Sequence, residues 1–460
     1  MGTTGTGTGI GMELVAASRS SVCFDFGTAY SKAARSPVGG SGGSSAIPLP
    51  IGRSANSLDT FIVPSLVFVE GDRIFLGPAA FDRLAECGQP GREALTSFKI
   101  LLASADLEAV LMTLPSPRVE PARRLIHRHL VVLFLAYLIS LADDALAGAR
   151  LGGISCFHSR FVLPDWTRRA NERRLGLISE LFEQAFLLAD VLGKNLISGS
   201  VDRIVLERGL SAISGGSIRN RIEGAIFEPA AAAFAFLPSI LADRATSIVV
   251  VDVGAGTTDF AGFRVSSNRG SRLVFLPETC RSADVAGDAF DAAVLNMIVE
   301  DDRIKLGLEE RDALWRSLSR NIRALKTTIV STGFLELTIG SRTLMFSLKA
   351  LEASPELNRS MAILSDHLDQ VVSLIGRRSN ASKERIGLII TGGGANFPFI
   401  QRMTQRRPGQ TKRAPLTRIA PPADRYVSLS EPVLNQLTTV LGGAAADRET
   451  MRALKKETFT

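Results

Sequence analysis

Two short segments, far apart in the sequence, share one pattern that strongly constrains the fold. Residues 22–31 (VCFDFGTAYS) and 248–260 (IVVVDVGAGTTDF) each run from an apolar strand through aspartate into a glycine–threonine turn, and then into strand-forming residues. Each segment predicts a β-hairpin whose turn carries a carboxylate, Asp25 or Asp252, beside exposed backbone N–H groups. We expect the two hairpins to face each other from two lobes.

Such paired turns are suited to phosphate chemistry. Glycine permits positive φ angles and close approach, so backbone N–H groups can point at phosphate oxygens, and the hydroxyls of Thr28, Thr257 and Thr258 can add donors. Carboxylates beside a phosphate site require a cation between them. Mg²⁺ suits the pattern, because it prefers few carboxylates, several waters and substrate phosphates. The sequence therefore predicts that Asp25 and Asp252 hold Mg²⁺ beside a bound nucleotide.

The length of 460 residues favours two lobes over one core. We expect a disordered Gly/Thr-rich tail over 1–19, a first lobe over 20–240 and a second lobe over 241–460. Each lobe opens with an Asp-Gly-Thr hairpin, which indicates a duplicated α/β architecture with a cleft between the halves. Within the first lobe, a long helix is expected from Asp165 to about Val191, a less regular stretch over 192–225, and a helix over 228–237.

Composition narrows the class of protein. The net charge of +7 comes from 53 basic and 46 acidic residues that are interspersed, without basic tracts among aromatics, so nucleic-acid binding is not expected. The four cysteines show no metal-binding spacing and fit a reducing compartment. The apolar run Leu130–Ala142 is too short to span a bilayer and predicts a buried helix. These features predict a soluble cytoplasmic protein without membrane contact.

With these motifs in place, the chain resembles a known superfamily. The hairpins look like the first and second phosphate motifs of the actin, sugar-kinase and heat-shock ATPases, whose two-lobed, duplicated, ribonuclease H-like fold has a central nucleotide cleft. Residues 391–398 (TGGGANFP) resemble its adenosine motif, and 228–233 (EPAAAA) its first connecting helix. Within that superfamily, the nucleotide-binding domain of the seventy-kilodalton heat-shock chaperones is most similar. Collinear secondary matches lie at 63–68, 74–80, 98–102 and 286–291.

The resemblance implies specific roles. Asp25 and Asp252 would hold Mg²⁺ through water. Lys99 would stabilise the γ-phosphate and the attacking water, and Glu228 would bond the water or the metal shell. Asp259 would support the site. The residues implied to contact ATP or ADP are Gly27, Thr28, Ala29, Gly254, Ala255, Gly256, Thr257, Thr258, Asp259, Gly287, Lys326, Gly392, Gly393 and Gly394.

The chain departs from the family pattern at several points. The acidic residue expected three before Lys326 is Arg323, and the small hydroxyl residue expected four after it is Val330. The stretch between Pro164 and Glu228 is longer than in the family. The chain stops soon after the adenosine motif, so we expect it to contain no peptide-binding domain.

Other interpretations compete with each assignment. A turn aspartate can bond its own backbone, a helix-start glutamate can serve the helix dipole, and Lys99 and Lys326 can be solvated helix lysines. For the whole chain, we expect a slowly ATP-hydrolysing, chaperone-like conformational switch that acts on an unidentified protein partner or client. The alternatives are an actin-like filament protein and a small-molecule kinase of the same superfamily. The oligomeric state stays open.

Overall fold

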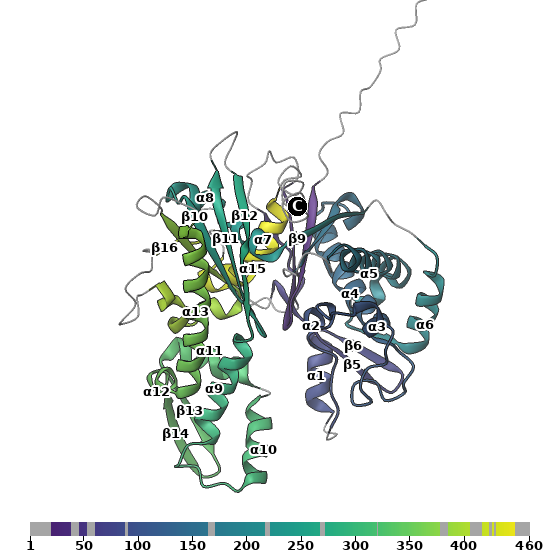
Figure 1. Ribbon diagram of the computed structural model, residues 1–460. Coiled ribbons are helices and arrows are strands. Elements are labelled where there is room, and N and C mark those ends of the chain that lie inside the picture. Colours follow the sequence, from purple (N-terminus) through teal and green to yellow (C-terminus); the bar gives the residue numbers. More distant parts are fainter. Residues whose placement is uncertain are drawn as a thin grey trace, which may run out of the picture.

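The computed structural model describes residues 20–37, 46–52, 60–87, 91–163, 171–216, 221–266, 272–319, 321–377, 385–404, 416–422, 426 and 429–446. The tail expected over 1–19 lies outside these residues. The described chain is an α/β protein with two mixed sheets, each flanked by helices, and its arrangement is consistent with two lobes (Figure 1).

The two main sheets share one strand order: a central strand has antiparallel strands on one side and two parallel strands on the other. Across the first sheet the strands are β3 (Ile47–Pro48) and β4 (Ile62–Pro64), which both pair with β2, then β2 (Tyr30–Arg35), β1 (Ser21–Phe26), β7 (His158–Leu163) and β9 (Ile222–Phe227). Across the second sheet they are β12 (Arg272–Ala283), β11 (Thr258–Ser266), β10 (Ser247–Val253), β15 (Ile386–Thr391) and β16 (Leu416–Arg418).

Smaller sheets and helices complete each lobe. The minor strands are β5 (Val67–Glu70), β6 (Arg73–Leu76) and β8 (Ser200–Asp202) in one sheet, and β13 (Phe334–Ile339) and β14 (Arg342–Ser347) in another. The helices before β10 are α1 (Pro78–Glu86), α2 (Phe98–Leu102), α3 (Leu107–Leu111), α4 (His127–Gly148), α5 (Asn171–Leu192), α6 (Arg203–Ala212), α7 (Glu228–Ala235) and α8 (Leu237–Ala242). Those after it are α9 (Gly287–Val299), α10 (Leu308–Ser319), α11 (Ile322–Thr332), α12 (Leu348–Ala353), α13 (Pro355–Arg377), α14 (Pro398–Gln401) and α15 (Glu431–Ala445).

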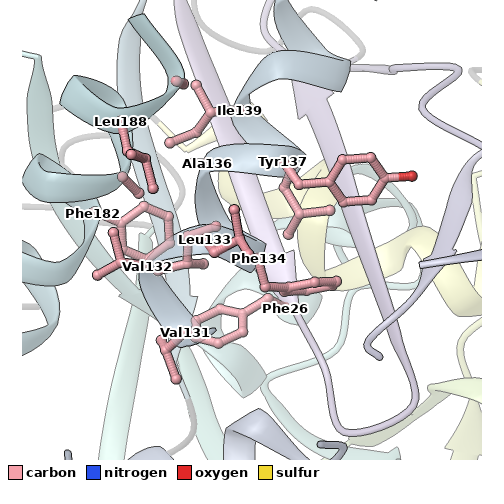
Figure 2. Close-up of a cluster of buried hydrophobic side chains, with 14 of the residues drawn as sticks. Phe26, Val131, Val132, Leu133, Phe134, Ala136, Tyr137, Ile139, Phe182 and Leu188 are labelled. Atoms are coloured by element: carbon pink, nitrogen blue, oxygen red, sulfur yellow. The ribbon is translucent and has the colours of Figure 1, made fainter. Parts of the chain in front are cut away.

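The outer core of the first lobe packs α4 and α5 against the first sheet. Alternate residues of β1, ending at Phe26, join this core because side chains of a strand point to opposite faces in turn. Figure 2 shows Phe26 beside Phe182 of α5 and the apolar side chains of α4. The rings of Phe26 and Phe182 meet edge to face, with centroids 6.0 Å apart. This packing fixes the face of β1 that turns away from the second lobe.

The inner core lies between the two sheets, and each half of the chain supplies one of its helices to the other half. Helix α7, from the first half, packs against β10, whereas α15, from the end of the chain, packs against β1, β2 and β7. Figure 1 shows both helices between the sheets. Their small residues allow this: a Cβ atom at Gly442 of α15 would lie 1.7 Å from the carbonyl oxygen of Ala231 in α7. The backbones of the two helices therefore touch.

One buried arginine ties the end of α15 to the first sheet. Arg160 of β7 donates to the carbonyl oxygens of Gly443 (3.1 Å) and Ala446, and its Nε donates to Glu223 at 2.6 Å. A cation that bonds the last carbonyls of a helix stabilises that helix end. The final helix is thus fixed to the first lobe by charge as well as by packing.

Helix α4 confirms the predicted buried helix. The argument that its apolar run is too short to span a bilayer was wrong. Among the described residues, α4 is the single helix long and apolar enough to cross a membrane, by length and composition alone. It has 22 residues, because the helix extends beyond the apolar run on both sides, and 72% of its most apolar window is buried within the protein. The core helix of a soluble protein passes the same test, so this is weak evidence for a membrane.

Two other sequence expectations need correction. The stretch 192–225, expected to be less regular, contains α6 and most of β9, which adds a parallel strand to the first sheet. The helix expected over 228–237 ends at Ala235, and α8 begins at Leu237 with proline in its first turn. The start expected for the long helix at Asp165 lies outside the described residues.

Candidate functional site

The predicted hairpins both form. In β1–β2, Asp25 pairs with Lys32, and the Gly27 N–H donates to the Tyr30 carbonyl at 3.1 Å. In β10–β11, Asp252 pairs with Asp259, and the Gly254 N–H donates to the Thr257 carbonyl at 2.9 Å.

Close approach, not a positive φ angle, explains the first glycine of each turn. Neither Gly27 nor Gly254 has a positive φ, contrary to one of the two reasons expected for glycine. A Cβ atom would lie 2.8 Å from the Tyr30 oxygen at Gly27 and 3.0 Å from the Thr257 oxygen at Gly254. Both turns are partly exposed. Their remaining backbone N–H groups are therefore placed where a ligand can reach them.

Strand alternation directs both aspartates toward the inner layer. Asp25 shares a strand face with Cys23, and Asp252 shares one with Ile248 and Val250, which all belong to the core between the sheets. Both aspartates are nearly buried, with exposures of 3% and 8%. The cross-strand partners, Lys32 and Asp259, point to the same faces because paired residues lie on one side of a sheet. The hairpins thus present their polar groups to each other.

Asp25 has two strong donors. Its Oδ2 accepts from Lys32 Nζ at 2.9 Å and from Thr439 Oγ1 of α15 at 2.5 Å. Burial opposes ionisation, but the charge of Lys32 and the Thr439 hydrogen bond outweigh it and lower the pKa of Asp25. The first carboxylate is therefore held in its charged form.

Asp252 has the opposite electrostatic environment. Burial and the charge of Asp259 raise the pKa of Asp252 to about 6, although Lys99 opposes the shift.

The side chains around the second turn bond one another. Asp259 accepts hydrogen bonds from Ser282 at 2.6 Å and from the Thr257 hydroxyl at 3.3 Å. Thr258, also predicted to bind phosphate, is fully buried and donates its hydroxyl to the Val285 carbonyl at 2.6 Å. In this arrangement Thr257 is the hydroxyl at the turn and Thr258 anchors the strand behind it.

Lys99 and Glu228 form a buried ion pair beside the hairpins. Lys99 Nζ lies 2.6 Å from Glu228 Oε2, and their side chains are 18% and 4% exposed. Glu228 opens α7, with proline next to it. Lys99 lies in the short helix α2, which is anchored because Phe98 stacks on Phe134 of α4 at 4.7 Å between centroids.

The surrounding carboxylates govern the ionisation of this pair. Burial and the carboxylates of both hairpins raise the pKa of Glu228 to about 8, even though Lys99 opposes the shift. Burial disfavours charge on Lys99, but the carboxylates, Glu228 foremost, raise its pKa.

The charges of this group do not balance. Its carboxylates are Asp25, Glu228, Asp252 and Asp259, and its ammonium groups are Lys32 and Lys99. When all are ionised, the group carries two more negative than positive charges. Within the residues that the structure describes, no three His, Cys, Asp or Glu side chains converge closely enough to hold a metal ion by themselves. Any cation here needs further ligands from water or a bound molecule.

The glycine turn after β15 reaches the second hairpin. Gly392 has a φ of 87° and lies so close to β10 that a Cβ atom would be 2.4 Å from Asp252 Oδ1. At Gly394 a Cβ atom would be 2.3 Å from the Val253 side chain, whereas Gly393 is exposed. The Gly392 N–H donates to the Asn435 carbonyl of α15 at 3.0 Å. Only glycine fits at Gly392 and Gly394 without displacing β10.

Helix α9 begins against the same hairpin. The N–H groups of Gly287 and Asp288 donate to the carbonyls of Gly254 (3.1 Å) and Ala255 (2.8 Å). Lys326 of α11 forms an ion pair with Asp291 of α9 and lies 5.6 Å from the ring centre of Phe397. Gly287 and the glycine turn therefore adjoin the second hairpin, and Lys326 is linked to them through Asp291 and Phe397.

Contacts also join the two lobes directly. Arg323 of α11 donates to the Tyr30 hydroxyl at 3.1 Å, and its guanidinium carbon lies 4.7 Å from the ring centre. A Cβ atom at Gly256 would lie 3.7 Å from Ile100 of α2. The departure noted at Arg323 is thus a cation that contacts the first hairpin.

Sequence reasoning missed two residues of this group. Lys32 has a recognisable signal, because the four residues 27–30 between the paired Phe26 and Ser31 place it opposite Asp25 in antiparallel register. Thr439 has none: it lies within an apolar helix, more than 400 residues from Asp25, and only the packing of α15 on β1 brings it there.

No known family model and no curated protein matches this chain.

Proposed function

We propose that this chain is an ATP-binding and slowly ATP-hydrolysing conformational switch, with the duplicated actin-like fold and a nucleotide site between its lobes. The observation that carries the proposal is the pair of Asp-Gly hairpins, which direct Asp25 and Asp252 toward each other beside the Lys99–Glu228 pair. The shared strand order of the two sheets and the exchanged helices α7 and α15 support the duplicated fold.

The chemistry of the group fits Mg²⁺ with a nucleotide. When all four carboxylates are ionised, a divalent cation supplies the two positive charges that the group lacks, and Mg²⁺ takes few protein ligands together with water and phosphate oxygens. Asp25 and Asp252 are the residues that would hold it, on the geometry of their facing strands. Bound there, Mg²⁺ would neutralise charge on the phosphates. The N–H groups of residues 28, 29 and 255–257, in the partly exposed turns, would bind phosphate oxygens.

Lys99 and Glu228 are suited to the reaction itself. A buried ammonium group stabilises the charge of a phosphoryl group strongly, since little water screens it. Glu228, whose pKa is raised to about 8, can accept or donate a hydrogen bond to an attacking water near neutral pH. Catalysis of phosphoryl transfer by positioning and charge alone needs no further group.

The residues that would contact the adenosine part of the nucleotide are Gly392, Gly393 and Lys326. Gly393 is exposed and the turn around it adjoins the second hairpin, so a base and ribose bound there would have their phosphates over Gly254 and Thr257. The Arg323–Tyr30 contact joins the lobes on the same side, which would make lobe closure sensitive to the bound nucleotide.

The test is ATP hydrolysis per molecule, with and without Mg²⁺, over a wide range of protein concentration. A slow rate independent of concentration supports the switch, and protease protection should then differ between ATP and ADP. A rate that rises sharply above a threshold concentration supports a filament, and phosphorylation of a sugar panel supports a kinase. Absence of nucleotide binding by calorimetry would overturn the proposal.

A further inference from the structure

We propose that Lys32 is a resident cation at Asp25, which competes with a divalent cation there and makes nucleotide binding only weakly dependent on Mg²⁺. The inference rests on the proposed nucleotide site and assigns a specific residue to its metal requirement. It goes beyond that function because neither hairpin motif by itself calls for a lysine on the return strand.

The geometry places the lysine where a cation would lie. Lys32 Nζ is 2.9 Å from Asp25 Oδ2, and the two side chains are 15% and 4% exposed. The register of β1 and β2 sets the two residues directly opposite each other, on the face that looks toward the second lobe. Thr439 donates to the same oxygen, so Oδ2 already has two strong donors. A metal ion at Asp25 must displace or share these partners.

The second hairpin offers an internal contrast. At the matching position opposite Asp252 stands Asp259, a carboxylate, so no ammonium group is built into that half by its own strand. The lysine therefore neutralises one side of the site only. Since a buried charge pair interacts far more strongly than one in water, removing the ammonium changes the cation affinity of Asp25 substantially.

A purely structural ion pair is the competing explanation. In that case Lys32 would close the hairpin, and its removal would lower stability without changing the metal requirement. The two explanations differ in the metal dependence of binding, which can be measured without turnover.

The experiment compares wild type with Lys32→Ala, Lys32→Arg and Arg35→Ala. Arg35 lies at the far end of the same strand and bonds the Ser36 carbonyl, so its variant removes one positive charge away from the site. Calorimetry measures binding of a non-hydrolysable ATP analogue in Mg²⁺ and in EDTA. A separate titration with Mn²⁺ alone, followed by electron paramagnetic resonance, measures cation affinity without nucleotide. Thermal melts verify that each variant is folded, and Lys32→Gln replaces Lys32→Ala if the alanine variant is not.

The inference predicts that EDTA weakens analogue binding by less than about tenfold in wild type, Lys32→Arg and Arg35→Ala, and by much more in Lys32→Ala. It also predicts that Lys32→Ala binds Mn²⁺ about tenfold or more tightly than wild type. Equal metal dependence in wild type and Lys32→Ala would overturn the inference and leave ATP binding intact. If no variant binds the analogue, the proposed function fails, and unchanged Mn²⁺ affinity in Lys32→Ala would then overturn the role of Lys32 as well.

Discussion

The two hairpins have the same turn but opposite electrostatic states. Opposite Asp25 stands Lys32, and the pKa of Asp25 is lowered; opposite Asp252 stands Asp259, and the pKa of Asp252 is raised to about 6. A shared backbone motif therefore does not imply a shared charge state. The first hairpin has an ammonium group opposite its aspartate, whereas the second has a carboxylate there. The cross-strand partner in each hairpin, together with the Thr439 hydrogen bond to Asp25, produces this difference.

The largest expected effect concerns Lys99, whose charge acts on the aspartates of both hairpins. Lys99 bonds Glu228 and is stabilised by the charges of Asp252 and Asp259. We expect Lys99→Ala to lower the rate of ATP hydrolysis by about a hundredfold or more, because removal of one preorganised charge stabiliser has effects of this size. Single-turnover kinetics measure the rate. Lys194→Ala, which removes an exposed lysine of the same lobe, is the control; equal rates in both variants would contradict the assignment.

Neutralising each aspartate in turn tests the contrast directly. Asp25→Asn should destabilise the nucleotide-free protein by about 3 kcal/mol, since it leaves the ammonium of Lys32 buried without its carboxylate. Asp252→Asn should instead stabilise it by about 1–2 kcal/mol at pH 8, because it removes a charge that burial and Asp259 disfavour. Urea denaturation measures both. Shifts of the same sign would show that the hairpins are electrostatically equivalent.

The raised pKa values also predict how stability depends on pH. Between about pH 4 and 8 the folded protein binds more protons at Asp252 and Glu228 than the unfolded chain does, so stability falls as pH rises. Asp25, with a lowered pKa, loses its contribution only below about pH 4, and Lys99 only at alkaline pH. Denaturation at pH 5.5, 7 and 8 measures the slope. Asp252→Asn should flatten it below pH 7; an unchanged slope would argue against a raised pKa at that residue.

The smallest effect concerns the hydroxyl that α15 contributes. Thr439→Val should cost about 1–2 kcal/mol, because it removes a hydrogen bond to a charged, buried carboxylate. Thr438→Val is a matched control, since that hydroxyl bonds only the Leu434 carbonyl of its own helix. Thermal melts compare the two variants, and a larger loss in Thr438→Val would mean that the Asp25 contact contributes little.

Local sequence predicted the structure correctly where all the residues of a feature lie within one hairpin. The residues around Asp25 and Asp252 predicted both turns, since strand alternation and a Gly-Thr turn are local properties. The strand β9 was missed because it contains Gly224 and a glutamate within a short apolar run. Its parallel partner β7 is about sixty residues earlier, and no local pattern reports such a pairing.

The same limit applies to the candidate site. Lys99 and Glu228 were chosen by resemblance, and the structure places them 2.6 Å apart, although 129 positions separate them in sequence. Lys32 was within reach of a register argument, whereas Thr439 was not, because its contact depends on the packing of a helix from the far end of the chain. The departure at Arg323 was visible in the sequence, but its contact with Tyr30 required the arrangement of both lobes.

The exchange of α7 and α15 has a consequence for synthesis on the ribosome. The face of the first sheet that carries Cys23 and Val162 is covered by α15, which is translated after every strand of the second sheet. Until α15 emerges, the apolar face of β1 and β2 lacks the helix that covers it, because α7, from its own half, packs on β7 and β9. The nascent first lobe therefore stays partly uncovered until the second sheet has been translated, and its completion coincides with the contact of Thr439 to Asp25.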